Sequence, residues 1–125
     1  MISIIDYGLG NVQAFSNIYK SLNVPAQVAK TQGALQGTTH IVLPGVGSFD
    51  QAMMMLNESG MLGFINKLVR EEDIPVLGIC VGMQILAKAS DEGEGNGLDW
   101  IDGRVRKIDR YHGEKNLPLP HMGWN

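Results

Sequence analysis

Short apolar runs recur along the first part of the chain, and helical or polar stretches separate them. The runs cover residues 1–6, 25–29, 40–43 and 74–79, and each has the length of a strand. Strands that alternate with helices pair in parallel, because each helix returns the chain to the same end of the sheet. The order therefore predicts an α/β fold, with an open, mostly parallel sheet and helices on both faces.

Two polar residues indicate where helices begin. Asn11 precedes a stripe of apolar residues at helical spacing, so it is a candidate N-cap for the first helix. Ser48 stands three positions before Gln51, in the form of a capping box, and residues 49–56 are good helix formers. Both residues predict a helix that follows a strand and covers the sheet.

The rest of the chain gives weaker patterns. Residues 61–70 and 81–89 have helical composition, and residues 98–108 suggest one or two short strands. Residues 111–125 are interpreted as a loop. With no repeat or linker in 125 residues, we expect a single domain.

The charge balance argues against several classes of partner. The net charge is -3 and the pI is about 5.5, so no broad basic surface is available for nucleic acid or an anionic membrane. The amino terminus has no signal-peptide pattern and no apolar run is long enough to span a bilayer, which predicts a cytoplasmic protein. The single cysteine allows no intrachain disulfide and no site of several thiolates, and we expect no metal and no cofactor.

That cysteine, Cys80, stands where a predicted strand meets a predicted helix. Gly78 and Gly82 flank it in the order G-x-C-x-G, which is a nucleophile elbow with cysteine in place of serine. The glycines remove side chains that would collide with neighbouring backbone, and a helix N-terminus favours the thiolate. A buried cysteine that only fills space is the alternative, and the two glycines argue against it.

A second glycine-rich turn follows the strand at residues 40–43. Pro44, Gly45, Val46 and Gly47 form it, and the carboxyl ends of parallel strands share one edge of the sheet. Its amides are therefore expected near Cys80, where together with the amide of Val81 they would form an oxyanion hole. This pairing predicts acyl transfer.

Five segments, taken in order, resemble the class I glutamine amidotransferases. They are IDYGLGN, LPGVGSFDQAM, PVLGICVGMQIL, SDEGEGNGLDWIDGRV and PHMGWN, and they span nearly the whole chain. GICVGMQ is similar to the family in general, whereas YGLGN and PHMGWN resemble the glutaminase subunits of imidazole glycerol phosphate synthase in histidine biosynthesis. The resemblance implies the flavodoxin-like fold of that family.

The resemblance also implies a reaction. Cys80 would attack the side-chain amide of glutamine, release ammonia and leave a glutamyl thioester that water hydrolyses. Val46 and Val81 would supply the oxyanion-hole amides. The residues implied to hold the glutamine substrate are Gly45, Gly47, Gln84 and Glu92.

A protein partner is implied as well. It is a (β/α)8 cyclase subunit that takes up the ammonia and forms imidazole glycerol phosphate. The candidate interface residues are Tyr7, Gly8, Asn11, His121, Met122, Trp124 and Asn125. The alternative for the PHMGWN segment is a turn in which Trp124 covers the core.

In the family, the histidine and glutamate of the triad follow the PHMGWN segment, and this sequence stops at Asn125. We therefore interpret residues 1–125 as the N-terminal portion of one domain and expect little glutaminase activity. We expect no His-x-Glu pair at His40, His112 or His121. An exposed apolar surface or sheet edge is also expected, and with it self-association.

Three other readings remain open. Gly8 and Gly10 resemble the start of a dinucleotide fingerprint, but the third glycine is absent and Ala14 stands one place late. A different cysteine hydrolase or stress-response protein, with an oxidisable cysteine, would share the elbow. A non-catalytic protein of the same fold, with a binding or scaffolding role, would share all five segments.

Overall fold

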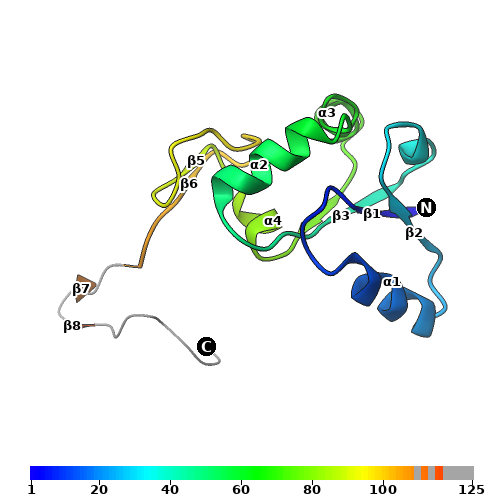
Figure 1. Cartoon of the computed structure of the whole chain (residues 1–125), viewed down its shortest axis with the longest axis horizontal. Coiled ribbons are helices and arrows are strands. Elements are labelled where there is room, and N and C mark those ends of the chain that lie inside the picture. Colours follow the sequence, from blue (N-terminus) through cyan, green and yellow to red (C-terminus); the bar gives the residue numbers. More distant parts are fainter. Residues whose placement is uncertain (109–110, 113–114, 117–125) are drawn as a thin grey trace.

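The computed structural model describes residues 1–108, 111–112 and 115–116. Its main sheet has four strands in the order β2-β1-β3-β4 (Figure 1). They are β1 (Ile2–Ile5), β2 (Ala26–Ala29), β3 (His40–Leu43) and β4 (Val76–Gly78). Every neighbouring pair in this sheet is parallel, so the predicted parallel α/β fold is confirmed.

Helices cover both faces of this sheet. α1 (Val12–Ser21) lies on one side, and α2 (Phe49–Glu58) and α3 (Leu62–Arg70) lie on the other (Figure 1). A short 3-10 helix, η1 (Gly33–Leu35), precedes β3. Both predicted caps are confirmed: Asn11 Oδ1 accepts the amide of Ala14 and Ser48 Oγ accepts that of Gln51, each at 3.1 Å.

The core lies between the sheet and the helices α2 and α3. Ile5 and Leu43 from the strands and Leu56 and Ile65 from the helices are completely buried. Full burial of one such side chain contributes roughly 1.5–3 kcal/mol, so this layer supplies most of the hydrophobic stabilisation.

The opposite face of the sheet is covered more thinly. Within the described part of the chain, α1 has no fully buried residue, and Ile18 on this helix is 51% exposed. Leu77 of β4 is 55% exposed, and an open groove of about 190 Å³ lies between Tyr19 of α1 and Leu77. An exposed apolar surface is thus present, while self-association stays a prediction.

The segment after β4 differs from the predicted helix at residues 81–89. Helix α4 (Val81–Gln84) has only four residues. It ends because the carbonyl oxygens of Ile85 and Leu86 accept the amides of Leu98 and Trp100, which come from a distant part of the chain. The chain then continues into β5 (Ala89–Ser90), which pairs in parallel with β6 (Arg104–Val105).

Two short strands lie where only a loop was predicted. β7 (Tyr111–His112) and β8 (Lys115–Asn116) form an antiparallel main-chain pair, so the loop prediction for residues 111–125 is wrong at these positions. Among the helices that the structure describes, none has the length and apolar character needed to span a bilayer.

Candidate active site

Cys80 occupies the turn between β4 and α4 in a strained backbone conformation. Its φ is 56° and its ψ is -125°, a region that residues with a Cβ rarely adopt, and the side chain is exposed. Such a conformation costs on the order of 1–3 kcal/mol and persists only where the surrounding structure enforces it. The alternative of a buried, space-filling cysteine is therefore wrong.

The flanking glycines are required by packing. A Cβ on Gly78 would lie 2.6 Å from the Cα of Met83. A Cβ on Gly82 would overlap the carbonyl oxygen of Leu43, the last residue of β3. Because these neighbours are backbone atoms that cannot rotate away, both positions accept only glycine without displacing the elbow.

The turn after β3 lies directly against this elbow. The amide of Ile79 donates to the carbonyl oxygen of Leu43 at 3.0 Å, and the amide of Val81 donates to that of Gly45 at 3.3 Å. A Cβ on Gly45 would be 2.9 Å from the amide nitrogen of Gly82. The PGVG turn and the nucleophile elbow therefore share the carboxyl edge of the sheet.

The two predicted oxyanion donors differ in their surroundings. The amide of Val81 is already engaged, through a rather long hydrogen bond to the Gly45 carbonyl oxygen. Val46 is 55% exposed, and its amide has no hydrogen-bond acceptor among the described residues. In this structure one of the two donors is available and the other is held within the turn.

Tyr7 does not match its predicted place at a partner interface. Its side chain is only 5% exposed, and its hydroxyl donates to the carbonyl oxygen of Pro44 at 2.6 Å. Burial raises the pKa of Tyr7 to about 12. Gly8 and Asn11 of the same loop are exposed. The remaining interface candidates, His121, Met122, Trp124 and Asn125, lie outside the described residues.

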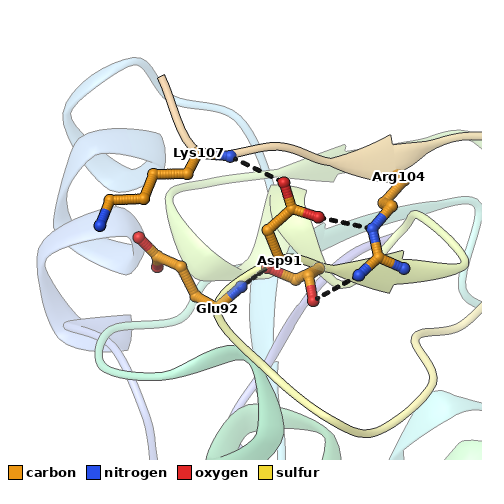
Figure 2. Close-up of polar contacts among 5 residues, drawn as sticks. Asp91, Glu92, Arg104 and Lys107 are labelled. Atoms are coloured by element: carbon orange, nitrogen blue, oxygen red, sulfur yellow. Dashed lines mark hydrogen bonds and ion pairs between the residues drawn. The ribbon is translucent and has the colours of Figure 1, made fainter. Parts of the chain in front are cut away.

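The predicted substrate residues come from three segments. Gly45 is buried beside the elbow, Gly47 is exposed in the same turn, and Gln84 ends α4 in a partly buried position. Glu92 is exposed in the acidic loop at residues 91–97, which follows β5. Figure 2 shows its side chain extending away from the ion pair of Asp91 and Arg104.

That ion pair fixes the start of the acidic loop. Asp91 accepts a hydrogen bond from Arg104 Nε at 2.6 Å and another from the amide of Lys107 at 3.3 Å (Figure 2). These two hydrogen bonds, chiefly the one from Arg104, hold the pKa of Asp91 below its usual value. β6 thus holds the loop at its first residue.

A second carboxylate at this loop was missed by the sequence reasoning. Asp50, in the first turn of α2, accepts the amides of Glu94 and Gly95 at 2.9 and 3.0 Å. These two backbone hydrogen bonds hold the pKa of Asp50 below its ordinary value. An acidic residue that follows a helix cap is too common a pattern to indicate this contact in the sequence.

No described histidine side chain is placed to act as a base at Cys80. His40 begins β3 and therefore lies at the amino edge of the sheet, opposite the elbow. The expectation that no His-x-Glu pair occurs is wrong, because His112 and Glu114 stand one residue apart. This pair precedes the PHMGWN segment, and Glu114 lies outside the described residues. Among the described residues, no three His, Cys, Asp or Glu side chains are grouped to bind a metal ion.

One family model and several curated proteins match this chain. The family model described as "Glutamine amidotransferase class-I" matches residues 3–125. The curated "Imidazole glycerol phosphate synthase subunit HisH" of Bdellovibrio bacteriovorus is 57% identical over 125 residues, and that of Leptospira interrogans is 50% identical. Each alignment covers all of this chain and 61% of the relative, so the chain spans about three-fifths of the length of these proteins.

The structural comparison supports the fold alone. A crystal structure of a glutamine amidotransferase superposes with a TM-score of 0.70 at 22% sequence identity. The match covers 90% of this chain and 58% of that one.

Proposed function

The chain belongs to the class I glutamine amidotransferase family, and we propose that Cys80 is the nucleophile that attacks the side-chain amide of glutamine. The observation that carries this proposal is the exposed sulfur at a strained turn whose flanking glycines have no room for a Cβ. Attack forms a tetrahedral intermediate, ammonia leaves after taking up a proton, and the glutamyl group stays bound to sulfur as a thioester. Water then releases glutamate and restores the thiol.

Charge develops on the former amide oxygen during both steps. The amide of Val46 is available to stabilise it, whereas that of Val81 must first exchange its 3.3 Å bond to Gly45 for a bond to the substrate. A charged oxygen is a stronger acceptor than a neutral carbonyl oxygen, so the developing charge itself favours this exchange.

The substrate is proposed to lie between the PGVG turn and the acidic loop. Gly45 packs against Gly82 of the elbow, Gly47 is exposed in the same turn, and Gln84 follows Cys80 by one helical turn. The exposed carboxylate of Glu92 complements the α-ammonium group of glutamine. These roles rest on family resemblance together with the shared edge of the sheet.

The names of the relatives suggest where the ammonia goes. Because HisH proteins are subunits of imidazole glycerol phosphate synthase, we propose that this protein supplies ammonia to a (β/α)8 cyclase subunit in histidine biosynthesis. Gly8 and Asn11, exposed in the loop before α1, and the PHMGWN segment are the proposed contact residues.

Bond formation at sulfur and complete turnover are separable. The elbow alone suffices for covalent labelling, whereas thioester hydrolysis needs a proton carrier that His40 cannot supply from the opposite edge. We propose that residues 1–125, assayed alone, are labelled at Cys80 but release little ammonia from glutamine.

A glutamine analogue with a diazoketone in place of the side-chain amide tests the proposal. Because the chain has a single cysteine, intact mass reports labelling of Cys80 without ambiguity. We expect a labelling rate that saturates with analogue concentration, competition by L-glutamine, and no labelling of Cys80→Ser. A rate that rises linearly, or that D-glutamine suppresses equally well, would show that no glutamine site surrounds the sulfur.

A further inference from the structure

The carboxylate of Asp50 joins two segments that the proposed function assigns to the glutamine site. Asp50 is the second residue of α2, and this helix begins directly after the PGVG turn and its cap, Ser48. Its Oδ2 accepts the amide of Glu94 at 2.9 Å, and its Oδ1 accepts the amide of Gly95 at 3.0 Å. One side chain therefore ties the acidic loop to the helix that the turn precedes.

Two glycines of the loop, Gly93 and Gly95, are explained by this carboxylate. A Cβ on Gly93 would lie 2.5 Å from Asp50 Oδ1, and a Cβ on Gly95 would lie 3.2 Å from the same atom. The amides of Glu94 and Gly95 can approach the carboxylate closely because no glycine side chain stands between it and the loop backbone. The EGEG pattern is thus complementary to Asp50, which lies more than 40 residues earlier in the chain.

Glu92 lies between two fixed points. Asp91, directly before it, is held by Arg104 and by the amide of Lys107 (Figure 2). The main chain at residues 94–95, directly beyond Gly93, is held by Asp50. The backbone that carries the Glu92 side chain therefore has little freedom, although the side chain itself is exposed.

We propose that Asp50 is a positioning residue for the glutamine site. It sets the separation between the PGVG turn, which contacts the reacting amide, and Glu92, which contacts the amino-acid end of the substrate. This inference rests on the proposed function and adds to it the element that fixes the length of ligand the site accepts. Asp50 itself does not touch the reacting atoms.

The substitution Asp50→Asn tests this role with little change of shape. The side-chain amide of asparagine keeps one acceptor oxygen but points its NH2 group towards one of the two backbone N–H donors. One of the two hydrogen bonds is therefore lost, and the acceptor of the other is no longer charged. We expect the analogue concentration at half-maximal labelling to rise roughly tenfold, which corresponds to the loss of one charge-assisted hydrogen bond. The maximal labelling rate and the rate with iodoacetamide, which needs no substrate site, should stay unchanged.

Two further variants separate positioning from general destabilisation. Glu94→Gln is the matched control, because Glu94 contributes only its main-chain amide to this contact, and it should label like the wild type. Gly93→Ala should raise the half-saturation concentration, because its Cβ displaces the carboxylate. In an Asp50→Ala background the same Gly93→Ala change should add nothing, since the obstructing oxygen is gone.

The outcomes distinguish this inference from the function on which it rests. If the wild type labels with saturation and Asp50→Asn keeps the wild-type half-saturation concentration, the positioning role is refuted and the glutaminase proposal stands. An equal loss of reactivity towards the analogue and iodoacetamide also refutes it, because the elbow itself would then be disturbed. If the wild type shows no saturation, the proposed function fails first and the role of Asp50 fails with it.

Discussion

The hydroxyl group of Tyr7 donates a 2.6 Å hydrogen bond to the carbonyl oxygen of Pro44. This bond connects the loop after β1 to the turn after β3, at the edge where Cys80 lies. Both partners are buried, so water cannot replace either one when the bond is broken. The position of the PGVG turn thus depends on a side chain from the loop after another strand, β1.

Replacing Tyr7 by phenylalanine should destabilise the fold. The ring remains, but the buried Pro44 carbonyl oxygen loses its partner, which costs roughly 1–3 kcal/mol of unfolding free energy. Urea denaturation measures this difference. Tyr19→Phe is the control, because the Tyr19 hydroxyl makes no hydrogen bond among the described residues, and it should unfold close to the wild type. Equal destabilisation by both substitutions would contradict the assigned role.

Alkaline pH should destabilise the protein through the same residue. The pKa of Tyr7 is raised from 10.0 to about 12 in the folded state, so its stabilising effect is complete below about pH 10 and declines as pH rises towards about 12. In that window the unfolded chain has already lost the proton that the folded chain keeps. The loss reaches on the order of 2–3 kcal/mol.

Denaturation at about pH 9 and about pH 11 checks this expectation. The wild type should lose more unfolding free energy between the two values than Tyr7→Phe, which has no phenol to ionise. Parallel losses in the two proteins would assign the alkaline effect to other groups.

Alanine should have opposite effects at two helical glycines. At Gly82 the added Cβ would overlap the Leu43 carbonyl oxygen, so Gly82→Ala should cost about 3 kcal/mol, at the upper end of overpacking penalties. At Gly63 in α3 a Cβ meets nothing within 4 Å, and Gly63→Ala should stabilise by roughly 0.5–1 kcal/mol. Thermal unfolding of the two variants gives the comparison, and stabilisation of both would contradict the close approach at Gly82.

The strained turn predicts an unusual order of stability at Cys80. Cys80→Gly should be more stable than Cys80→Ala by about 1 kcal/mol, because glycine adopts a φ of 56° without strain. Lys67 is an exposed position within α3, where glycine lowers helix stability. There the order should be reversed, and Lys67→Ala should be more stable than Lys67→Gly by about 1 kcal/mol. Denaturant unfolding of the four variants tests both orders, and alanine proving better at Cys80 would mean that the turn relaxes in solution.

The elements that follow from nearby residues were predictable from the sequence. β3 has the predicted bounds, because a short apolar run before Pro44 has few alternatives. Asn11 and Ser48 cap helices through hydrogen bonds that span only three residues. The elbow at Cys80 was also predictable, since the glycines that make it possible are its neighbours in the sequence.

Apart from the short local pair of β7 and β8, the features that the sequence did not predict depend on contacts between distant segments. α4 ends early because Ile85 and Leu86 bind amides from residues 98–100, and nothing within residues 81–89 indicates this. The contact of Tyr7 with Pro44 spans 37 residues and that of Asp50 with Glu94 spans 44. Such pairs become visible only once the sheet order brings their segments together.

Helix α1 is attached to the protein differently from the elements around Cys80. It has no completely buried residue, whereas Ala52 and Leu56 of α2 are entirely inaccessible to solvent. Local opening of a helix held in this way requires less free energy than unfolding of the core, so its amides should exchange hydrogen earliest. The loop that contains Gly8 and Asn11 leads into this loosely held helix. The surface formed by this loop can therefore adapt to a binding partner while the sulfur atom of Cys80 keeps its position.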